Sequence, residues 1–294
     1  MENQPTPTLY IIATPIGNLE DISLRALRVL GEVEALACED TRLTRRIFER
    51  HKVPSPRTIF SYHEHNEAQA GQRIIGLLDT GVSVALCTDG GYPGISDPGY
   101  RVIAECYERG FHVEVIPGPS AVDVALVASG LSTATYTFMG FPPRKPGPLK
   151  RFLEMDRDTP HTLVFFESPF RVAKMLAAAR EIYGNRFAAV CIELTKKFEE
   201  IHRGYLEELA PKFQTKPPKG EITIVIAGNN PKFARPNEDP GANEDTPDDE
   251  ETQHLHRPCP AAQSLFPHSS QCHCERSEAI PCIANKLAAE HPVY

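Results

Sequence analysis

The 294-residue sequence contains no apolar run near the roughly 18 residues that a membrane-spanning helix requires. Its longest apolar stretches, such as residues 222–227, have the length of a single strand. No basic residue precedes the first apolar run, so we expect no secretory signal. Apolar residues make up 41% and charged residues 24% of the chain, as in ordinary globular proteins. We therefore expect a cytoplasmic protein with a sizeable core and no membrane contact.

The two glycine-rich motifs that most often bind nucleotide phosphates are also missing. Neither G-x-G-x-x-G nor G-x-x-x-x-G-K-[ST] occurs anywhere in the chain. This absence argues against an oxidoreductase that uses a dinucleotide and against a nucleoside triphosphatase.

A general excess of positive charge is missing as well. The chain has 31 basic and 39 acidic residues, of which residues 231–294 hold 5 and 11. Residues 1–230 are therefore almost neutral. A protein that coats nucleic acid broadly needs many cations to neutralise phosphates, so this class is excluded, although local basic patches remain possible.

The last 64 residues differ from the rest in composition. Residues 231–294 contain 9 prolines but only 8 leucine, isoleucine, valine or phenylalanine residues. Such a segment buries too little apolar surface to offset its ordering entropy, so we predict a disordered, acidic and proline-rich tail. Its Cys272-His273-Cys274 triplet, with Cys259 and Cys282 nearby, fits no standard zinc spacing, and we expect no metal. The remaining cysteines, expected to be reduced thiols in a cytosolic core, are Cys38, Cys87, Cys106 and Cys191.

Short apolar runs alternate with helical patterns along residues 8–230. The first set is typical of a doubly wound parallel sheet. In the second set, residues 200–204 suggest an added antiparallel strand, and hence a mixed sheet. We predict two α/β domains, 8–118 and 119–230, followed by the tail 231–294. The expected strands are 9–13, 35–38, 58–61, 82–87 and 112–116, then 136–140, 162–166, 188–193, 200–204 and 221–227.

Glycine- and proline-rich turns follow three of the predicted strands, at residues 14–18, 88–99 and 117–121. Ligands of open α/β sheets bind at the carboxyl ends of the strands. Glycine lets the backbone approach a ligand closely, and proline keeps a loop rigid. Each turn alone is compatible with a simple tight connection, but three at one sheet edge favour a binding crevice.

Six segments in a fixed order resemble a known family. These segments are 14–21, 89–99, 117–121, 138–144, 165–171 and 193–200. Together they resemble the ribosomal small subunit methyltransferase I family, a bacterial branch of the tetrapyrrole methylase superfamily, over residues 8–228. The resemblance implies 2′-O-methylation of a cytidine ribose (position 1402) in 16S rRNA, with S-adenosylmethionine as donor. It also implies a homodimer with the donor in a cleft between the two domains.

The resemblance places the donor mainly against backbone and apolar groups, which suit a cationic sulfonium. The donor-binding residues that it implies are Pro15, Gly91, Tyr92, Pro93, Gly94, Ile95, Ser120, Ala121, Phe166, Glu167 and Leu194.

Candidate catalytic residues lie at predicted strand ends. Asp40, Glu167 and Glu193 are candidate general bases for the weakly acidic ribose hydroxyl, and each is also compatible with capping a helix or pairing with an arginine. Lys196 and Arg144 could bind a phosphate or stabilise developing charge, or could simply be solvated.

Two basic clusters are candidates for contact with 16S rRNA, which we expect the protein to meet within the 30S subunit. One follows the second strand and includes Arg42, Arg45 and Arg46; the other includes Arg144 and Lys145. A few phosphate contacts at these places would position RNA, and its shape would supply specificity. Methylation of a tetrapyrrole or a protein side chain, and a non-catalytic sensor of the donor, remain alternatives.

Overall fold

Two five-stranded sheets, each built from a continuous part of the chain, organise the protein. The computed structural model describes residues 6–230, and these lie in one compact unit. The predicted tail and its cysteines therefore lie outside the described residues. None of the described helices is long and apolar enough to cross a membrane.

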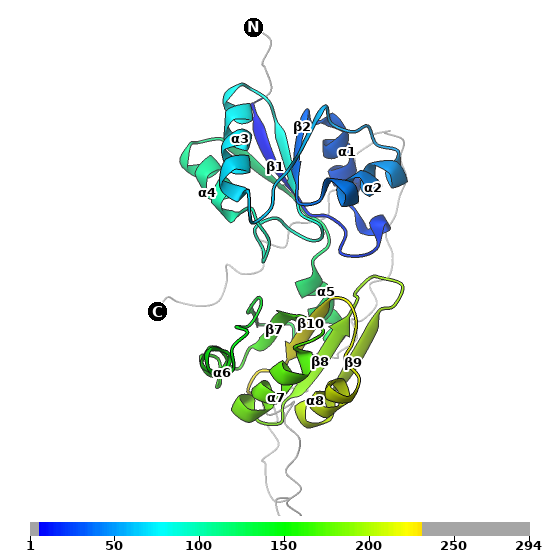
Figure 1. Ribbon diagram of the computed structural model, residues 1–294, viewed down its shortest axis with the longest axis vertical. Coiled ribbons are helices and arrows are strands. Elements are labelled where there is room, and N and C mark those ends of the chain that lie inside the picture. The colour runs from blue at the N-terminus through cyan, green and yellow to red at the C-terminus, as the bar shows by residue number, and fades with distance from the viewer. Residues whose placement is uncertain (1–5, 231–294) are drawn as a thin grey trace, which may run out of the picture. The chain divides into compact units, whose positions relative to one another are not determined.

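The first sheet is parallel throughout, with strand order β3-β2-β4-β1-β5, as the sequence predicts. Helices α1 and α2 lie on one side of it and α3 and α4 on the other (Figure 1). Its strands are β1 (Thr8–Ile12), β2 (Ala35–Cys38), β3 (Thr58–Ser61), β4 (Val84–Cys87) and β5 (His112–Ile116). Its helices are α1 (Leu24–Glu32), α2 (Thr41–His51), α3 (Glu67–Asp79) and α4 (Tyr100–Glu108), with a short 3₁₀ turn at Leu19–Asp21.

Alternation along β1 explains the two helical layers. Leu9 and Ile11 pack with α3 and α4, whereas Ile12 packs with α1 and α2. Helix α1 begins where the Ser23 side chain accepts a hydrogen bond from the backbone N–H of Ala26. Both faces of the sheet are therefore covered, and its carboxyl edge is left for ligands.

The second sheet is mixed, as predicted, with order β6-β7-β10-β8-β9. Only β6 and β7 run parallel; the other neighbours are antiparallel. Its strands are β6 (Tyr136–Phe138), β7 (Thr162–Glu167), β8 (Phe187–Ile192), β9 (Glu200–Tyr205) and β10 (Ile222–Ile226). Its helices are α5 (Ala121–Ser129), α6 (Pro146–Glu154), α7 (Val172–Tyr183) and α8 (Leu206–Thr215).

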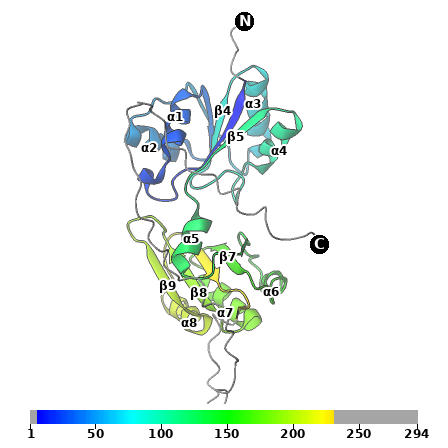
Figure 2. The same cartoon turned by 180° about the vertical axis from the view of Figure 1, so that it is seen from behind.

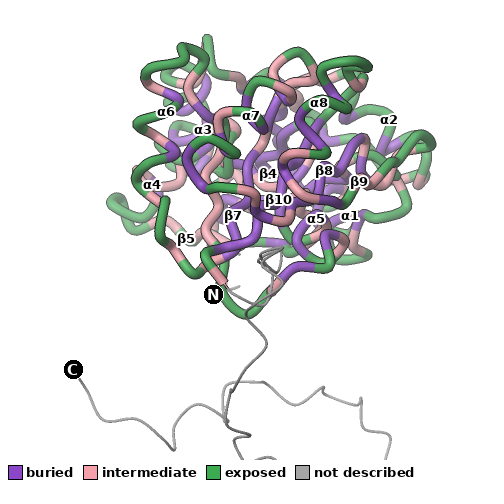
Figure 3. Tube along the Cα trace, turned by 90° about the horizontal axis from the view of Figure 1, so that it is seen from below, coloured by how far each residue is buried: buried purple, intermediate pink, exposed green. Residues whose placement is uncertain are grey.

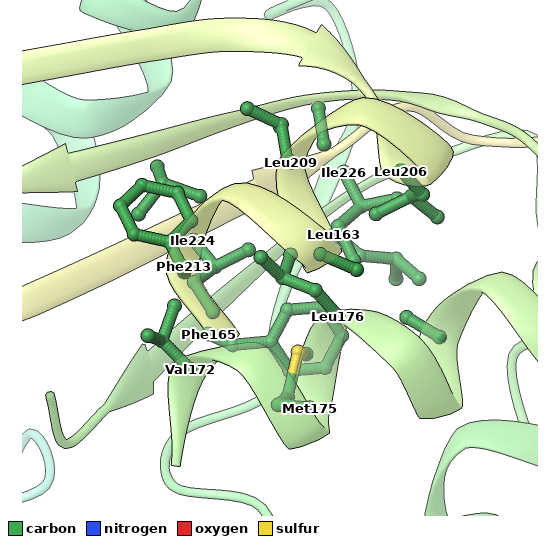
Figure 4. Packing of buried hydrophobic residues seen from close by; sticks show 14 of the residues in the cluster. Leu163, Phe165, Val172, Met175, Leu176, Leu206, Leu209, Phe213, Ile224 and Ile226 are labelled. Atoms are coloured by element: carbon green, nitrogen blue, oxygen red, sulfur yellow. The ribbon is translucent and has the colours of Figure 1, made fainter. Parts of the chain in front are cut away.

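Helices also cover both faces of the second sheet. Helices α7 and α8 pack on one face, where Phe165, Leu176 and Phe213 interdigitate (Figure 4). Helix α5 covers the other face, which is turned to the viewer in Figure 2. Burial is concentrated along the strands, including β4, β8 and β10 (Figure 3). The two cores give the loops at the strand ends a rigid support.

Helix α5 was not anticipated from the sequence. Val122, Ala125 and Leu126 are buried, but the equally apolar Val127 on the outer side of the helix is 74% exposed. Because the segment is apolar on almost every side, it has little of the periodicity that reveals an amphipathic helix. The domain limits 8–118 and 119–230 stay a prediction.

Candidate active site

The three glycine-rich turns meet at the carboxyl edge of the first sheet. Thr14 and Gly91 exchange two backbone hydrogen bonds of 2.9 Å, which join the loop after β1 to the loop after β4. The Tyr92 hydroxyl accepts a hydrogen bond of 3.0 Å from the backbone N–H of Gly118, which joins the loop after β5. The turns therefore form one continuous surface.

Two positions in the loop after β4 require glycine. Gly91 has a φ of 85°, which residues with a Cβ rarely adopt. Gly99 has a φ of 142°, and a Cβ there would lie 2.9 Å from the backbone nitrogen of Gly94. The tight course of this loop is thus built into its sequence.

A cavity of about 720 Å³ opens beside these loops, within the usual range of ligand pockets. Residues from both sheets line it, and the Asn18 N–H donates to Thr195 Oγ1 at 3.1 Å nearby. Four of the predicted donor-binding residues are in its lining: Pro15, Ala121, Phe166 and Glu167.

The other predicted donor-binding residues are not in the lining of this cavity. They are Gly91, Tyr92, Pro93, Gly94, Ile95, Ser120 and Leu194. Gly91 and Tyr92 hold the loops together, as described above. The Ser120 side chain caps α5 by accepting from Asp123 N–H, and Leu194 is buried in the core under α5.

Asp40 caps a helix and pairs with an arginine, which is the alternative to a general base that its position in the sequence allowed. Its carboxylate caps α2 by accepting from Arg42 N–H at 2.8 Å, and it pairs with the Arg42 guanidinium at 2.7 Å. These hydrogen bonds from Arg42 lower the pKa of Asp40 to about 2. A carboxylate with so low a pKa is a weak proton acceptor.

Glu167 lies at the end of β7 with its side chain fully buried. It pairs with Arg171 at 2.9 Å and accepts from the Ser168 N–H at 2.7 Å. Burial raises its pKa, while Ser168, Arg171 and the more distant Arg144 oppose this shift. Arg171 also donates to the Pro142 carbonyl at 2.7 Å, so this pair fixes the loop before α6.

Glu193 and Lys196 form an ion-pair network with Glu221. The Lys196 ammonium lies 2.9 Å from Glu193 and 3.0 Å from Glu221. Glu193 also accepts from the Glu221 N–H at 2.9 Å. Burial alone would raise the pKa of Glu193, but these hydrogen bonds hold it below its ordinary value. Of the three, Lys196 and Glu221 line the cavity.

Three further carboxylates line the cavity and were not singled out from the sequence: Glu39, Asp89 and Asp97. The Asp89 N–H donates to Glu39 at 3.3 Å, and burial raises the pKa of both groups. Burial, followed by the charges of Glu39 and Asp89, raises the pKa of Asp97 to about 7. The position of Asp89 and Asp97 in the 88–99 run was the available signal. Over residues 6–230, no group of three or more potential ligands is arranged for a metal.

The predicted basic clusters are exposed, and only part of them reaches the cavity. Arg46 on α2 is in the lining, whereas Arg45 is exposed on the same helix and Arg42 is occupied by Asp40. Arg144 and Lys145 are exposed in the loop before α6.

Comparison with known proteins identifies the family of this fold. The family model "Tetrapyrrole (Corrin/Porphyrin) Methylases" matches residues 8–210. The chain is 46% identical over 232 residues to "Ribosomal RNA small subunit methyltransferase I" of Mesorhizobium japonicum, with 78% of each chain covered. It is 43% identical over 225 residues to the protein of the same name from Halalkalibacterium halodurans, covering 76% of this chain and 77% of that one.

A solved structure shows the same fold. A cobalt precorrin-4 methyltransferase superposes with a TM-score of 0.59 at 17% identity, covering 77% of this chain and 97% of that one. The resemblance stated from the sequence is thereby confirmed: this chain belongs to the ribosomal RNA small subunit methyltransferase I family of the tetrapyrrole methylases.

Proposed function

We propose that this chain transfers a methyl group from S-adenosylmethionine to the 2′-oxygen of a cytidine ribose (position 1402) in 16S rRNA. The relatives named above are methyltransferases of small subunit ribosomal RNA by name. The observation that carries the proposal is the cavity of about 720 Å³ where the glycine-rich loops meet residues of the second sheet.

The lining of the cavity fits this donor. The sulfonium and the ammonium of S-adenosylmethionine are cations, and Glu39 and Asp89 supply negative charge. Phe166 adds an aromatic ring, and Pro15 and Ala121 add apolar surface. In our proposal these groups bind the donor, together with the loop 91–95 and with Ser120 and Leu194.

The chain's main contribution to the reaction is positioning. Methyl transfer is an in-line displacement, so holding the ribose oxygen about 3 Å from the methyl carbon supplies much of the acceleration. Asp40, Glu167 and Glu193 are held by hydrogen bonds or ion pairs, so we assign them to shaping the site. We assign Lys196 and Arg144 to the substrate's phosphate or the developing charge.

RNA binding would use the exposed cations beside the cavity. Arg45 and Arg46 on α2, with Arg42 at its start, and Arg144 and Lys145 before α6 would contact phosphates and orient the strand. The assembled 30S subunit would supply the shape that selects one nucleotide, and the chain would act as a homodimer.

The test is methyl transfer from labelled S-adenosylmethionine to 30S subunits that lack this modification. Naked 16S rRNA and a tetrapyrrole precursor are offered in parallel. Label on a single ribose 2′-oxygen of the rRNA is the expected result. Label on the tetrapyrrole would assign the chain to another branch, and a bound donor with no transfer to any acceptor would favour a sensor.

A further inference from the structure

Asp97 differs from the other carboxylates that line the cavity. Glu167 pairs with Arg171, and Glu221 pairs with Lys196. Asp97, in contrast, forms no ion pair with any residue between 6 and 230, and the nearby Thr88 side chain only slightly favours its charged form. The negative charge of the Asp97 carboxylate is therefore not neutralised by a cation among the described residues.

The two remaining carboxylates of the lining are tied to backbone groups. Glu39 accepts from the Asp89 N–H at 3.3 Å, and Asp89 accepts from the Asp40 N–H at 3.0 Å. These bonds join the ends of β2 and β4, so moving either carboxylate would disturb the loops. The Asp97 carboxylate does not join two strand ends in this way.

The loop holds Asp97 in a defined place. Its neighbour Ser96 has a φ of 62°, which a non-glycine residue adopts only where the surroundings enforce it. The Pro98 carbonyl accepts from the Gly94 N–H at 3.2 Å, and the Gly99 N–H donates to Glu67 on α3 at 3.2 Å. Both sides of Asp97 are thus anchored.

The charged groups that face Asp97 come from several elements. Glu39 follows β2, Asp89 follows β4, and Glu221 precedes β10; all three raise the cost of ionising Asp97. The cations of the cavity lining are Arg46 on α2 and Lys196, and Lys196 is shared between Glu193 and Glu221. Burial and these anions make Asp97 a stronger base than an ordinary aspartate, with its pKa raised to about 7.

We propose that Asp97 is the general base that removes the proton from the acceptor hydroxyl. This inference rests on the function proposed above. As the ribose oxygen bonds to the methyl carbon, its proton passes to the Asp97 carboxylate. The carbon–sulfur bond breaks with its electron pair left on sulfur, which becomes a neutral thioether. Asp97 then returns the proton to water.

The experiment compares the full-length wild type with Asp97→Asn and with the control Asp79→Asn at the exposed end of α3. Single-turnover methyl transfer to 30S subunits is followed from pH 5.5 to 9, and donor affinity is measured by calorimetry. The wild-type rate should rise with pH and level off above a midpoint near 7. Asp97→Asn should lose about 10²–10⁴-fold in rate and this pH dependence, with the donor's Kd within about threefold of wild type. Asp79→Asn should behave as wild type.

The outcomes separate the two proposals. If Asp97→Asn transfers the methyl group at the wild-type rate with the same pH profile, Asp97 is not the base, while the proposed function stands. If the variant loses donor affinity but keeps the rate at saturating donor, Asp97 binds the donor and the inference is overturned. If the wild type itself transfers nothing, the proposed function fails and the inference fails with it.

Discussion

Gly17 offers a direct test of how the first loop meets the loop between β8 and β9. A Cβ at this position would lie 2.9 Å from the backbone oxygen of Leu194 and 2.7 Å from Thr195 Oγ1. Real Cβ atoms do not approach backbone that closely, so Gly17→Ala forces the two loops apart. The neighbouring hydrogen bond from Asn18 N–H to Thr195, 3.1 Å long, would stretch with them.

Overpacking of this kind costs about 1–3 kcal/mol. Because the two loops flank the cavity, we expect most of this cost in the donor's affinity, which corresponds to an increase in Kd of about 5- to 150-fold. Gly76→Ala is the matched control, since a Cβ at that position in α3 meets nothing within 4 Å. It should leave the Kd unchanged and stabilise the helix by about 1 kcal/mol. Calorimetric titration with S-adenosylmethionine measures the Kd of both variants. A wild-type Kd in Gly17→Ala would refute the reasoning.

Three other perturbations have defined outcomes. Leu176→Ala in the core of the second sheet removes a fully buried side chain and should cost about 2–5 kcal/mol in urea unfolding; a loss below 1 kcal/mol would contradict the packing in Figure 4. The double change Arg45→Glu and Arg46→Glu should weaken rRNA binding and lower its salt dependence by about one unit of slope per lost contact. An unchanged slope would remove α2 from the RNA surface. The raised pKa of Asp97 means that its ionisation destabilises the fold as pH rises from about 4 to 7. Asp97→Asn should therefore melt higher than wild type at pH 8 and match it near pH 4; equal melting at both pH values would contradict the burial of this carboxylate.

Much of the architecture follows from local patterns. The parallel first sheet could be predicted because its strands are short apolar runs, and each of the first four is followed by a turn and an amphipathic helix. The glycines and prolines of the loop 88–99 pointed to this edge of the sheet. Residues 88–90, 96 and 97 line the cavity, whereas the predicted donor-binding residues 91–95 do not. Helix α5 could not be predicted, because its residues are apolar on almost every side, including the exposed Val127, and so lack the periodicity of an amphipathic helix.

The carboxylates of the site were harder to predict because their environment depends on strand order. Glu39 and Asp89 are 50 residues apart, and they meet only because β2 and β4 are neighbours in the sheet. Asp40 stood out in the sequence as the second residue after a strand, yet its hydrogen bonds with Arg42 are what lower its pKa. A sequence pattern locates such residues at an edge; the partner of each one is decided by tertiary structure.

The position of β10 has a consequence for how the chain folds during synthesis. All five strands of the first sheet precede residue 117, so that sheet can assemble while the rest is still being translated. In the second sheet, β10 is the last strand made but lies in the middle, between β7 and β8. Until it emerges from the ribosome, β7 and β8 present unpaired edges that are open to association with other chains. The nascent protein is therefore prone to association with other chains until β10, which ends at residue 226, can insert between β7 and β8.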